Sequence, residues 1–131
     1  MTMAKNGRAL LIDDDGLVRA MLTDVLQTFG YVVDADDSGE AALARFAAGL
    51  YDVVITDQRM PGMTGLEVAA AIRRSDPSVP VVLLTGGAGV PGVEDGNTNV
   101  RIVYKPVNVM KLMAELDTLR RRVAQPSAPC R

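Results

Sequence analysis

Side chains that could do chemistry stand directly after short apolar runs of this sequence. Three are acidic, one carries a hydroxyl and one is basic: Asp13, Asp14, Asp57, Thr85 and Lys105. Three carboxylates gathered in one crevice repel one another unless a cation lies among them. A carboxylate can also act as a nucleophile that forms an acyl phosphate. These residue types therefore suggest a cation site next to a carboxylate nucleophile.

The chain contains no histidine, and this absence limits the chemistry further. It excludes a histidine base, a histidine metal ligand and a phosphohistidine on this chain. Oxygen ligands without histidine or cysteine favour a hard divalent ion, Mg²⁺ or Mn²⁺. With such an ion on one side, the Lys105 ammonium and the Thr85 hydroxyl could neutralise the oxygens of a phosphoryl group during its transfer.

Length and composition predict a single cytoplasmic domain. The chain has 131 residues, 48% of them apolar, which is enough for one domain with a real core. The net charge of −2 and the pI near 5.0 argue against direct binding of nucleic acid. No apolar run approaches the ~18 residues of a membrane span, and no signal peptide precedes the first predicted strand. The single cysteine, Cys130, cannot form an internal disulfide.

Short apolar runs alternate with amphipathic stretches along the chain. The runs lack polar alternation, which is typical of strands covered on both faces. This order predicts an α/β fold, a doubly wound parallel sheet with helices on both faces. The carboxyl ends of its strands would share one edge, where ligands bind. The predicted strands are 9–12, 31–33, 53–56, 80–85 and 101–104, and the predicted helices are 17–29, 38–48, 64–75 and 108–123.

Capping residues set the limits of several predicted helices. Asp15, Ser38 and Asn108 are suitable N-caps, and Gly30 is a suitable stop after the first helix. Segments 1–7 and 125–131 are expected to be tails, the second of them disordered, which leaves 8–124 as the folded domain. Helical spacing predicts inward-facing stripes on the first and last helices: Val18, Met21, Leu22, Val25, Leu26 and Phe29, and Met110, Met113, Leu116, Leu119 and Val123.

The segment 86–99 interrupts the alternation. A helix belongs here, yet the segment contains five glycines and a proline. Each glycine costs about 1 kcal/mol and an interior proline about 3 kcal/mol in a helix. We therefore predict that the fourth helix is short or missing, with at most one helical turn around 93–95.

The residues after the strands resemble those of a known family, the receiver domain of two-component response regulators. The matching motifs are 11–14, 55–57 together with 60–65, 84–85 and 104–106. Each motif alone is weak, but all of them in this order on the expected strand ends are specific. The resemblance spans about 9–123 and implies a flavodoxin-like sheet of five parallel strands in the order 2-1-3-4-5.

The resemblance also implies a role for each residue of the site. Asp57 would accept a phosphoryl group from a phosphohistidine. Asp14 and Asp57 would bind Mg²⁺ directly, together with the Arg59 backbone carbonyl, while Asp13 would act mainly through a metal-bound water. Lys105 would pair with Asp57 at rest and with the phosphoryl group after transfer.

Two further residues would take part in switching or in the local backbone. Thr85 would move to hydrogen-bond a phosphoryl oxygen, and the bond before Pro106 is expected to be cis. The phosphoryl donor would be a sensor histidine kinase or a histidine phosphotransfer protein. The domain would catalyse at most its own phosphorylation and dephosphorylation, so it is not expected to be an enzyme in the ordinary sense. A homodimer is compatible with this interpretation; nucleic acid and membrane partners are not expected.

Two departures from the family pattern bear on switching. The position three residues before Lys105, usually aromatic in the family, is Ile102. The segment 86–99 looks poor in helix, so signalling could run through its ordering instead.

Two other functions compete with phosphoacceptance. An interaction module that is not phosphorylated would leave the acidic set, Thr85 and Lys105 without a purpose. A haloacid-dehalogenase-like phosphatase would use Asp13 and Asp15, but Gly16 stands where such enzymes carry Thr or Val.

Overall fold

A five-stranded parallel sheet forms the centre of the domain. The computed structural model describes residues 6–87 and 100–124, with side chains as far as Leu119. The strand order is β2-β1-β3-β4-β5, as predicted. The strands are β1 (Gly7–Ile12), β2 (Tyr31–Asp36), β3 (Val53–Asp57), β4 (Val81–Thr85) and β5 (Val100–Tyr104).

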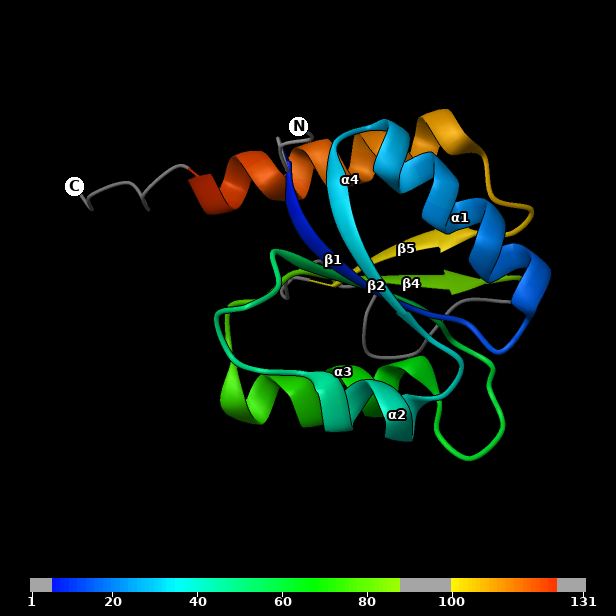
Figure 1. Ribbon diagram of the computed structural model, residues 1–131, viewed down its shortest axis with the longest axis vertical. Helices are drawn as coiled ribbons and strands as arrows, with labels where there is room; N and C mark the ends of the chain where they lie inside the picture. Colours follow the sequence, from blue (N-terminus) through cyan, green and yellow to red (C-terminus); the bar gives the residue numbers. More distant parts are fainter. Residues whose placement is uncertain (1–5, 88–99, 125–131) are drawn as a thin grey trace.

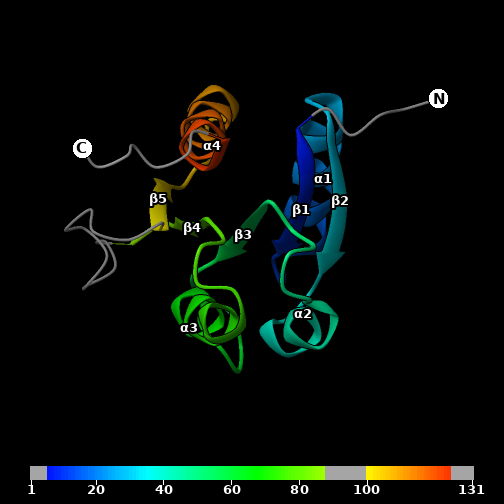
Figure 2. The ribbon, with the colours of Figure 1, turned by 90° about the vertical axis from the view of Figure 1, so that its left-hand side faces the viewer.

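Helices cover both faces of the sheet, so the described part of the chain forms three layers (Figures 1 and 2). These helices are α1 (Gly16–Thr28), α2 (Gly39–Arg45), α3 (Gly65–Ser75) and α4 (Val109–Ala124). Figure 2 shows α1 and α4 on one side of the strands and α2 and α3 on the other. The core accordingly splits into two apolar clusters, one on each face of the sheet. β3 and β4 are buried along their whole length, which explains their unbroken apolar sequence.

The predicted caps are present at the helix ends. The Asp15 carboxylate accepts from the backbone N–H groups of Leu17 and Val18, and Ser38 caps α2 in the same way. Thr64 and Glu67 form a reciprocal capping box at the start of α3. These contacts satisfy backbone donors that the first helical turn leaves free.

The second helix is shorter than predicted. It ends at Arg45 rather than near residue 48, because Phe46 leaves the helical conformation for an extended one. The Phe46 ring stacks on Tyr51 with 5.7 Å between the ring centroids, and it packs against the core of this face. A tertiary contact therefore ends α2 before its local helix propensity does. β1 and β2 are also longer than predicted, since they pair in parallel register from Gly7↔Tyr31 to Ile12↔Asp36.

The inward stripes of α1 and α4 are only partly as predicted. Leu22 and Leu26 are buried in α1, whereas Met21 and Phe29 reach the surface. In α4 the buried positions are Leu112, Leu116 and Leu119, and Met110 is exposed. The spacing of this buried set, four and then three residues, selects one narrow face of α4. The predicted face differs from this one because it included Met110 and Met113 and left out Leu112.

Three predictions lie outside the described residues. They concern nearly all of the glycine-rich segment 86–99 and most of the two tails, 1–7 and 125–131. The boundaries 8 and 124 therefore stay predictions. Among the described helices, none is both long and apolar enough to cross a membrane.

Candidate functional site

The predicted acids meet at the carboxyl edge of the sheet. In the register of β1 and β3, Ile12 pairs with Thr56, so the next residues, Asp13 and Asp57, come out side by side. One carboxylate oxygen from each of Asp13, Asp14 and Asp57 lies within 4.8 Å of the others. We refer to these three acids together with Lys105 as the acidic site.

Asp13 is the most deeply buried acid of the site, with 0% of its surface exposed. Its Oδ1 accepts a hydrogen bond of 2.9 Å from the backbone N–H of Asp15. Its Oδ2 is also buried and has no hydrogen-bond partner among the described residues. Burial raises the pKa of the Asp13 carboxyl, and the neighbouring charges of Asp57 and Asp14 raise it further. The fold thus holds an acid in a place that disfavours its charged form.

Asp57 is paired with the one basic side chain of the site. Lys105 Nζ lies 2.8 Å from Asp57 Oδ1, which is the resting ion pair that the resemblance implies. Burial alone would lower the pKa of Lys105, but the bond to Asp57 and the charges of Asp13 and Asp14 outweigh it. The net direction is upward, so Lys105 stays protonated. Asp57 itself is only 6% exposed.

The end of β4 brings Thr85 to the same edge. Thr85 pairs with Tyr104 in the sheet, and its carbonyl accepts a 2.8 Å bond from the N–H of Lys105. Its side chain is buried, and Thr85 Oγ1 accepts from the N–H of Gly87 at 3.2 Å. The bond between Lys105 and Pro106 is cis, as predicted.

The residues of the acidic site fit a hard divalent cation. The donors are carboxylate oxygens from adjacent strand ends, and one of them, Asp13 Oδ2, is buried with no partner in the described part of the chain. A cation among these oxygens would remove both their repulsion and the unpaired atom. No described residue supplies a histidine or thiolate ligand here, which favours Mg²⁺ over softer metals.

The loop after Asp57 is fixed by contacts that the sequence did not reveal. Gln58 Oε1 accepts from the N–H of Leu66 at 2.8 Å, and the Gln58 carbonyl accepts from Gly65 at 3.0 Å. A Cβ on Gly65 would lie 2.5 Å from the Asp57 carbonyl oxygen, so this close approach needs glycine. The only sequence signal for Gln58 is its place beside Asp57.

Asp15 differs in its role from Asp13 and Asp14, the other acids of the loop between β1 and α1. Its Oδ1 accepts from Leu17 N–H and Val18 N–H at 3.0 and 3.2 Å, so it caps α1. Asp15 is also absent from the group of carboxylates that could hold a metal. The phosphatase alternative, which needs Asp15 beside Asp13 in catalysis, therefore gains no support.

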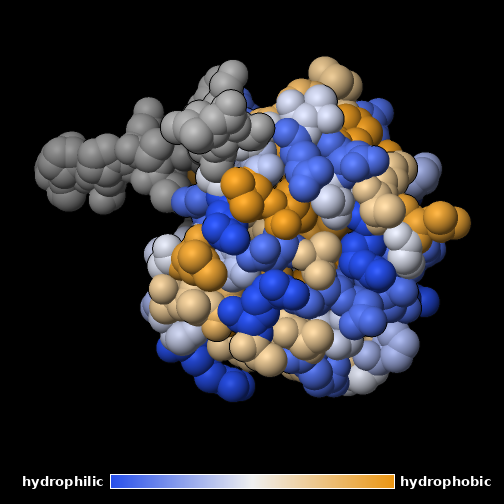
Figure 3. All heavy atoms as spheres, in the orientation of Figure 1, coloured by the Kyte–Doolittle hydropathy of each residue, from blue (hydrophilic) through white to orange (hydrophobic). Residues whose placement is uncertain are grey.

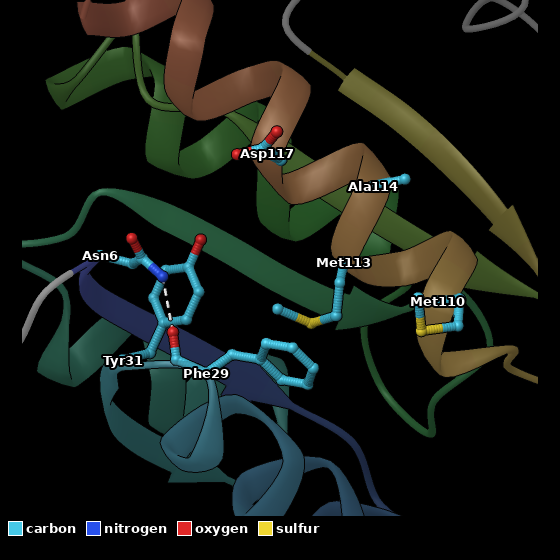
Figure 4. A pocket seen from close by; sticks show the side chains of 7 residues that line it. All are labelled: Asn6, Phe29, Tyr31, Met110, Met113, Ala114 and Asp117. Atoms are coloured by element: carbon cyan, nitrogen blue, oxygen red, sulfur yellow. Dashed lines mark hydrogen bonds between the residues drawn. The ribbon is translucent and has the colours of Figure 1, made fainter.

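A hollow lies between α4 and the turn that joins α1 to β2, and it is separate from the acidic site. Its volume is about 310 Å³, and it is lined by Asn6, Phe29, Tyr31, Met110, Met113, Ala114 and Asp117. Figure 4 shows the Phe29 ring and the Met113 side chain facing each other across it, with Asn6 bonded to the Phe29 carbonyl. None of the predicted site residues lines this pocket.

Comparison with known proteins places the whole domain in one family. The family model described as response regulator receiver domain matches residues 9–117. The transcriptional regulatory protein TcrA of Mycobacterium tuberculosis is 34% identical over 93% of this chain and 49% of its own length. The response regulator receiver protein CpdR of Brucella abortus is 30% identical over 86% of this chain and 95% of its own. The response regulator TrrA of Thermotoga maritima, solved in complex with Mg²⁺–BeF, gives a TM-score of 0.76 at 35% identity, covering 86% of this chain and 98% of that one.

The fold, the acidic site and these matches agree: the chain belongs to the receiver domains of two-component response regulators. Receiver domains bind Mg²⁺ at an acidic site, which corresponds here to Asp13, Asp14 and Asp57. The chain spans about half the length of the first curated relatives it matches.

Proposed function

We propose that Asp57 is the phosphoacceptor of this receiver domain and that its phosphorylation switches the conformation of the domain. One observation carries the proposal. A buried carboxylate at the end of β3 is paired with Lys105 at 2.8 Å and lies beside two further acids. One of these acids has a buried oxygen with no hydrogen-bond partner in the part of the chain that the structure describes. That arrangement supplies a nucleophile, a fixed cation and the ligands for a second cation in one place.

In the proposed reaction, an Asp57 oxygen attacks the phosphorus of a phosphohistidine on another protein. The phosphorus–oxygen bond forms as the phosphorus–nitrogen bond breaks, and the departing imidazole takes up a proton. The products are an aspartyl phosphate on this chain and a free histidine on the donor. Attack of water on the same phosphorus later releases inorganic phosphate and restores the carboxylate. In this sense the domain acts only on its own phosphoryl group.

Asp13, Asp14 and Asp57, with the backbone carbonyl of Arg59, would hold Mg²⁺ at the site. Mn²⁺ suits the same oxygen ligands. When bound, the ion supplies positive charge to the phosphoryl oxygens. Asp13 would contribute mainly through a metal-bound water, as the family resemblance implies.

Lys105 and Thr85 would act on the phosphoryl group from the protein side. The Lys105 ammonium, freed from Asp57 by the transfer, would pair with a phosphoryl oxygen instead. The Thr85 hydroxyl accepts from Gly87 at rest and would turn to donate to a phosphoryl oxygen. That movement would pass the change from the site to the chain after β4.

The surroundings of the site suit a protein donor. Exposed apolar side chains lie on the elements that start beside the acidic site: Leu17 and Met21 on α1 and Met110 on α4. Figure 3 shows hydrophobic groups reaching the surface at the edge where α1 begins. We therefore propose a sensor histidine kinase or a histidine phosphotransfer protein as the partner, in the cytoplasm where ATP supplies such donors. Neither nucleic acid nor a membrane is part of this proposal, and a homodimer is compatible with it.

The direct test uses a small phosphodonor in place of the partner. The protein is incubated with acetyl phosphate, with and without Mg²⁺, and its intact mass is measured. We expect a Mg²⁺-dependent adduct of one phosphoryl group, stable in acid and labile in base, which Asp57→Asn lacks. If the donor protein is required, purified phosphohistidine donor should produce the same adduct. An adduct that persists in Asp57→Asn would contradict the assignment.

A further inference from the structure

The side-chain contacts of Asp13 do not by themselves fix the orientation of its carboxylate. Among the described residues, its carboxylate has one hydrogen bond, from Asp15, and its Oδ2 has no partner. The orientation of this group therefore depends on how firmly the backbone of the β1–α1 loop is held. The N–H of Asp13 donates to the Asp36 carbonyl at 3.1 Å, which continues the pairing of β1 with β2.

The carbonyl of Asp13 has a charged partner. Arg19 Nη1 donates to Asp13 O at 2.8 Å, across six positions of the chain. Asp13 is the first residue after β1, and a carbonyl that leaves a sheet without a partner is costly when buried. The guanidinium thus donates to this carbonyl the hydrogen bond that a neighbouring strand would supply within the sheet.

The geometry of α1 brings Arg19 to this place. The N–H of Arg19 donates to the Asp15 carbonyl at 2.9 Å, so Arg19 belongs to the first turn of the helix. Side chains of a helix lean toward its N-terminus, which lets a long arginine reach back over that turn. A Cβ added at Gly16 would lie 3.7 Å from Arg19 Nη2, so the guanidinium lies against the start of α1.

Arg19 does not act as the counter-ion of the acidic site. Its contact is with a backbone carbonyl, whereas the fixed cation that pairs with a site carboxylate is Lys105. The charges that act on Asp13 are those of Asp57, Lys105 and Asp14. What Arg19 controls is the position of the loop.

We propose that Arg19 is a positioning residue of the metal site: by holding the Asp13 carbonyl, it keeps Asp13 Oδ2, which has no partner among the described residues, directed into the cation site. The inference rests on the proposed Mg²⁺ site. Partners one step removed from the metal ligands change metal affinity by about 10–100-fold when they are lost. No sequence motif indicates this role for Arg19. An arginine in the first turn of a helix can nevertheless reach back to the loop before that helix.

Mg²⁺ affinity, measured by isothermal titration calorimetry on the whole chain, tests the proposal. Arg19→Met removes the donor and keeps the apolar stem, and we expect Mg²⁺ to bind it about 10-fold more weakly. Arg19→Lys keeps an N–H donor on a long stem and should stay within about threefold of the unaltered protein. The matched control is Arg101→Met, which breaks the 2.7 Å ion pair that joins Arg101 on β5 to Glu115 on α4. It should leave Mg²⁺ affinity unchanged.

A second measurement separates positioning from general stability. Thermal unfolding in EDTA shows what each variant loses without metal, and amide hydrogen exchange of residues 13–16 reports on the loop itself. We expect faster exchange in this loop for Arg19→Met only. Unchanged Mg²⁺ affinity in Arg19→Met, or equal weakening in Arg101→Met, would overturn the positioning role while leaving the Mg²⁺ site intact. Absence of Mg²⁺ binding in the unaltered protein would overturn the metal site and, with it, the role of Arg19.

Discussion

Two groups of acids on neighbouring strands of this sheet are built in opposite ways. In the acidic site, three carboxylates share one lysine, and a buried oxygen of Asp13 has no partner in the described part of the chain. On β2, Asp34 accepts from the Tyr51 hydroxyl at 2.7 Å and from Arg8 at 3.2 Å, and Asp36 accepts two bonds from Arg45. We call Asp34, Asp36, Tyr51, Arg8 and Arg45 the β2 cluster.

The pKa shifts of the two groups run in opposite directions. The hydrogen bond from Tyr51 lowers the pKa of Asp34, despite the opposing effect of burial, and the Arg8 contact lowers it further. Burial raises the pKa of Asp13. The Tyr51 hydroxyl responds in turn, because burial and the Asp34 carboxylate raise its pKa to about 12. The β2 cluster is complete as a structural unit, whereas the acidic site is complete only with an added cation.

The largest expected effect comes from Asp57→Asn. It removes the only carboxylate that ends β3 and contacts Lys105, so phosphorylation by acetyl phosphate should be lost entirely. Intact mass is the measurement. Asp34→Asn, which removes a carboxylate from the β2 cluster, is the matched control and should still be phosphorylated.

Asp13→Asn should stabilise the metal-free protein at neutral pH. A buried acid with a raised pKa stabilises the fold when protonated, and that contribution is lost as the pH rises through its folded pKa. Removing the charge should therefore add about 1 kcal/mol to the free energy of unfolding at pH 7 in EDTA. The gain should shrink as the pH falls and the carboxyl becomes protonated. A loss of stability at pH 7 would mean that the unpaired charge is not costly.

Tyr51→Phe should have the reverse profile. It removes the hydroxyl that donates to a charged carboxylate, at a cost of about 1.5 kcal/mol at neutral pH. Asp34 has a lowered pKa, so its contribution is present above the usual value of 3.8 and lost as the pH falls through the lower folded value. Denaturant unfolding of both proteins between pH 3 and pH 7 should show the two curves converging in acid. Parallel curves would show that the hydroxyl contributes only by packing.

The smallest effect is expected for Arg45→Met. Arg45 makes two bonds to Asp36, yet its side chain is 45% exposed, and pairs that solvent reaches in this way add little stability. We expect no change in the thermal midpoint beyond experimental error. A clear drop would indicate that the β2 cluster depends on its outer ion pair.

These two regions also differ in how far the sequence predicted them. Strand-end residues such as Asp57 and Lys105 could be located because buried parallel strands are unbroken apolar runs and their ends share an edge. No sequence pattern predicted the β2 cluster, since Asp34 and Tyr51 come together only through tertiary packing. The early end of α2 at Phe46 has the same origin.

Within the candidate site, the sequence predicted which acids converge better than it predicted the residues that hold their backbone. Asp13, Asp14 and Asp57 converge as expected, and Lys105 pairs with Asp57. The sequence did not predict the contacts of Gln58 and Arg19, because each side chain bonds a backbone group and no residue spacing indicates such a bond.

We propose that Mg²⁺ completes the acidic site, whereas the β2 cluster needs no metal ion. Thermal unfolding of the unaltered protein, Asp13→Asn and Asp34→Asn over a Mg²⁺ series tests it most directly. Binding to the folded state adds about 2.7 kcal/mol when Mg²⁺ reaches 100 times its Kd. We predict that the midpoint rises with Mg²⁺ in the unaltered protein and in Asp34→Asn, and rises far less in Asp13→Asn. An equal rise in all three proteins would show that Asp13 is not part of the Mg²⁺ site. No rise in any of them would show that Mg²⁺ does not bind the folded protein.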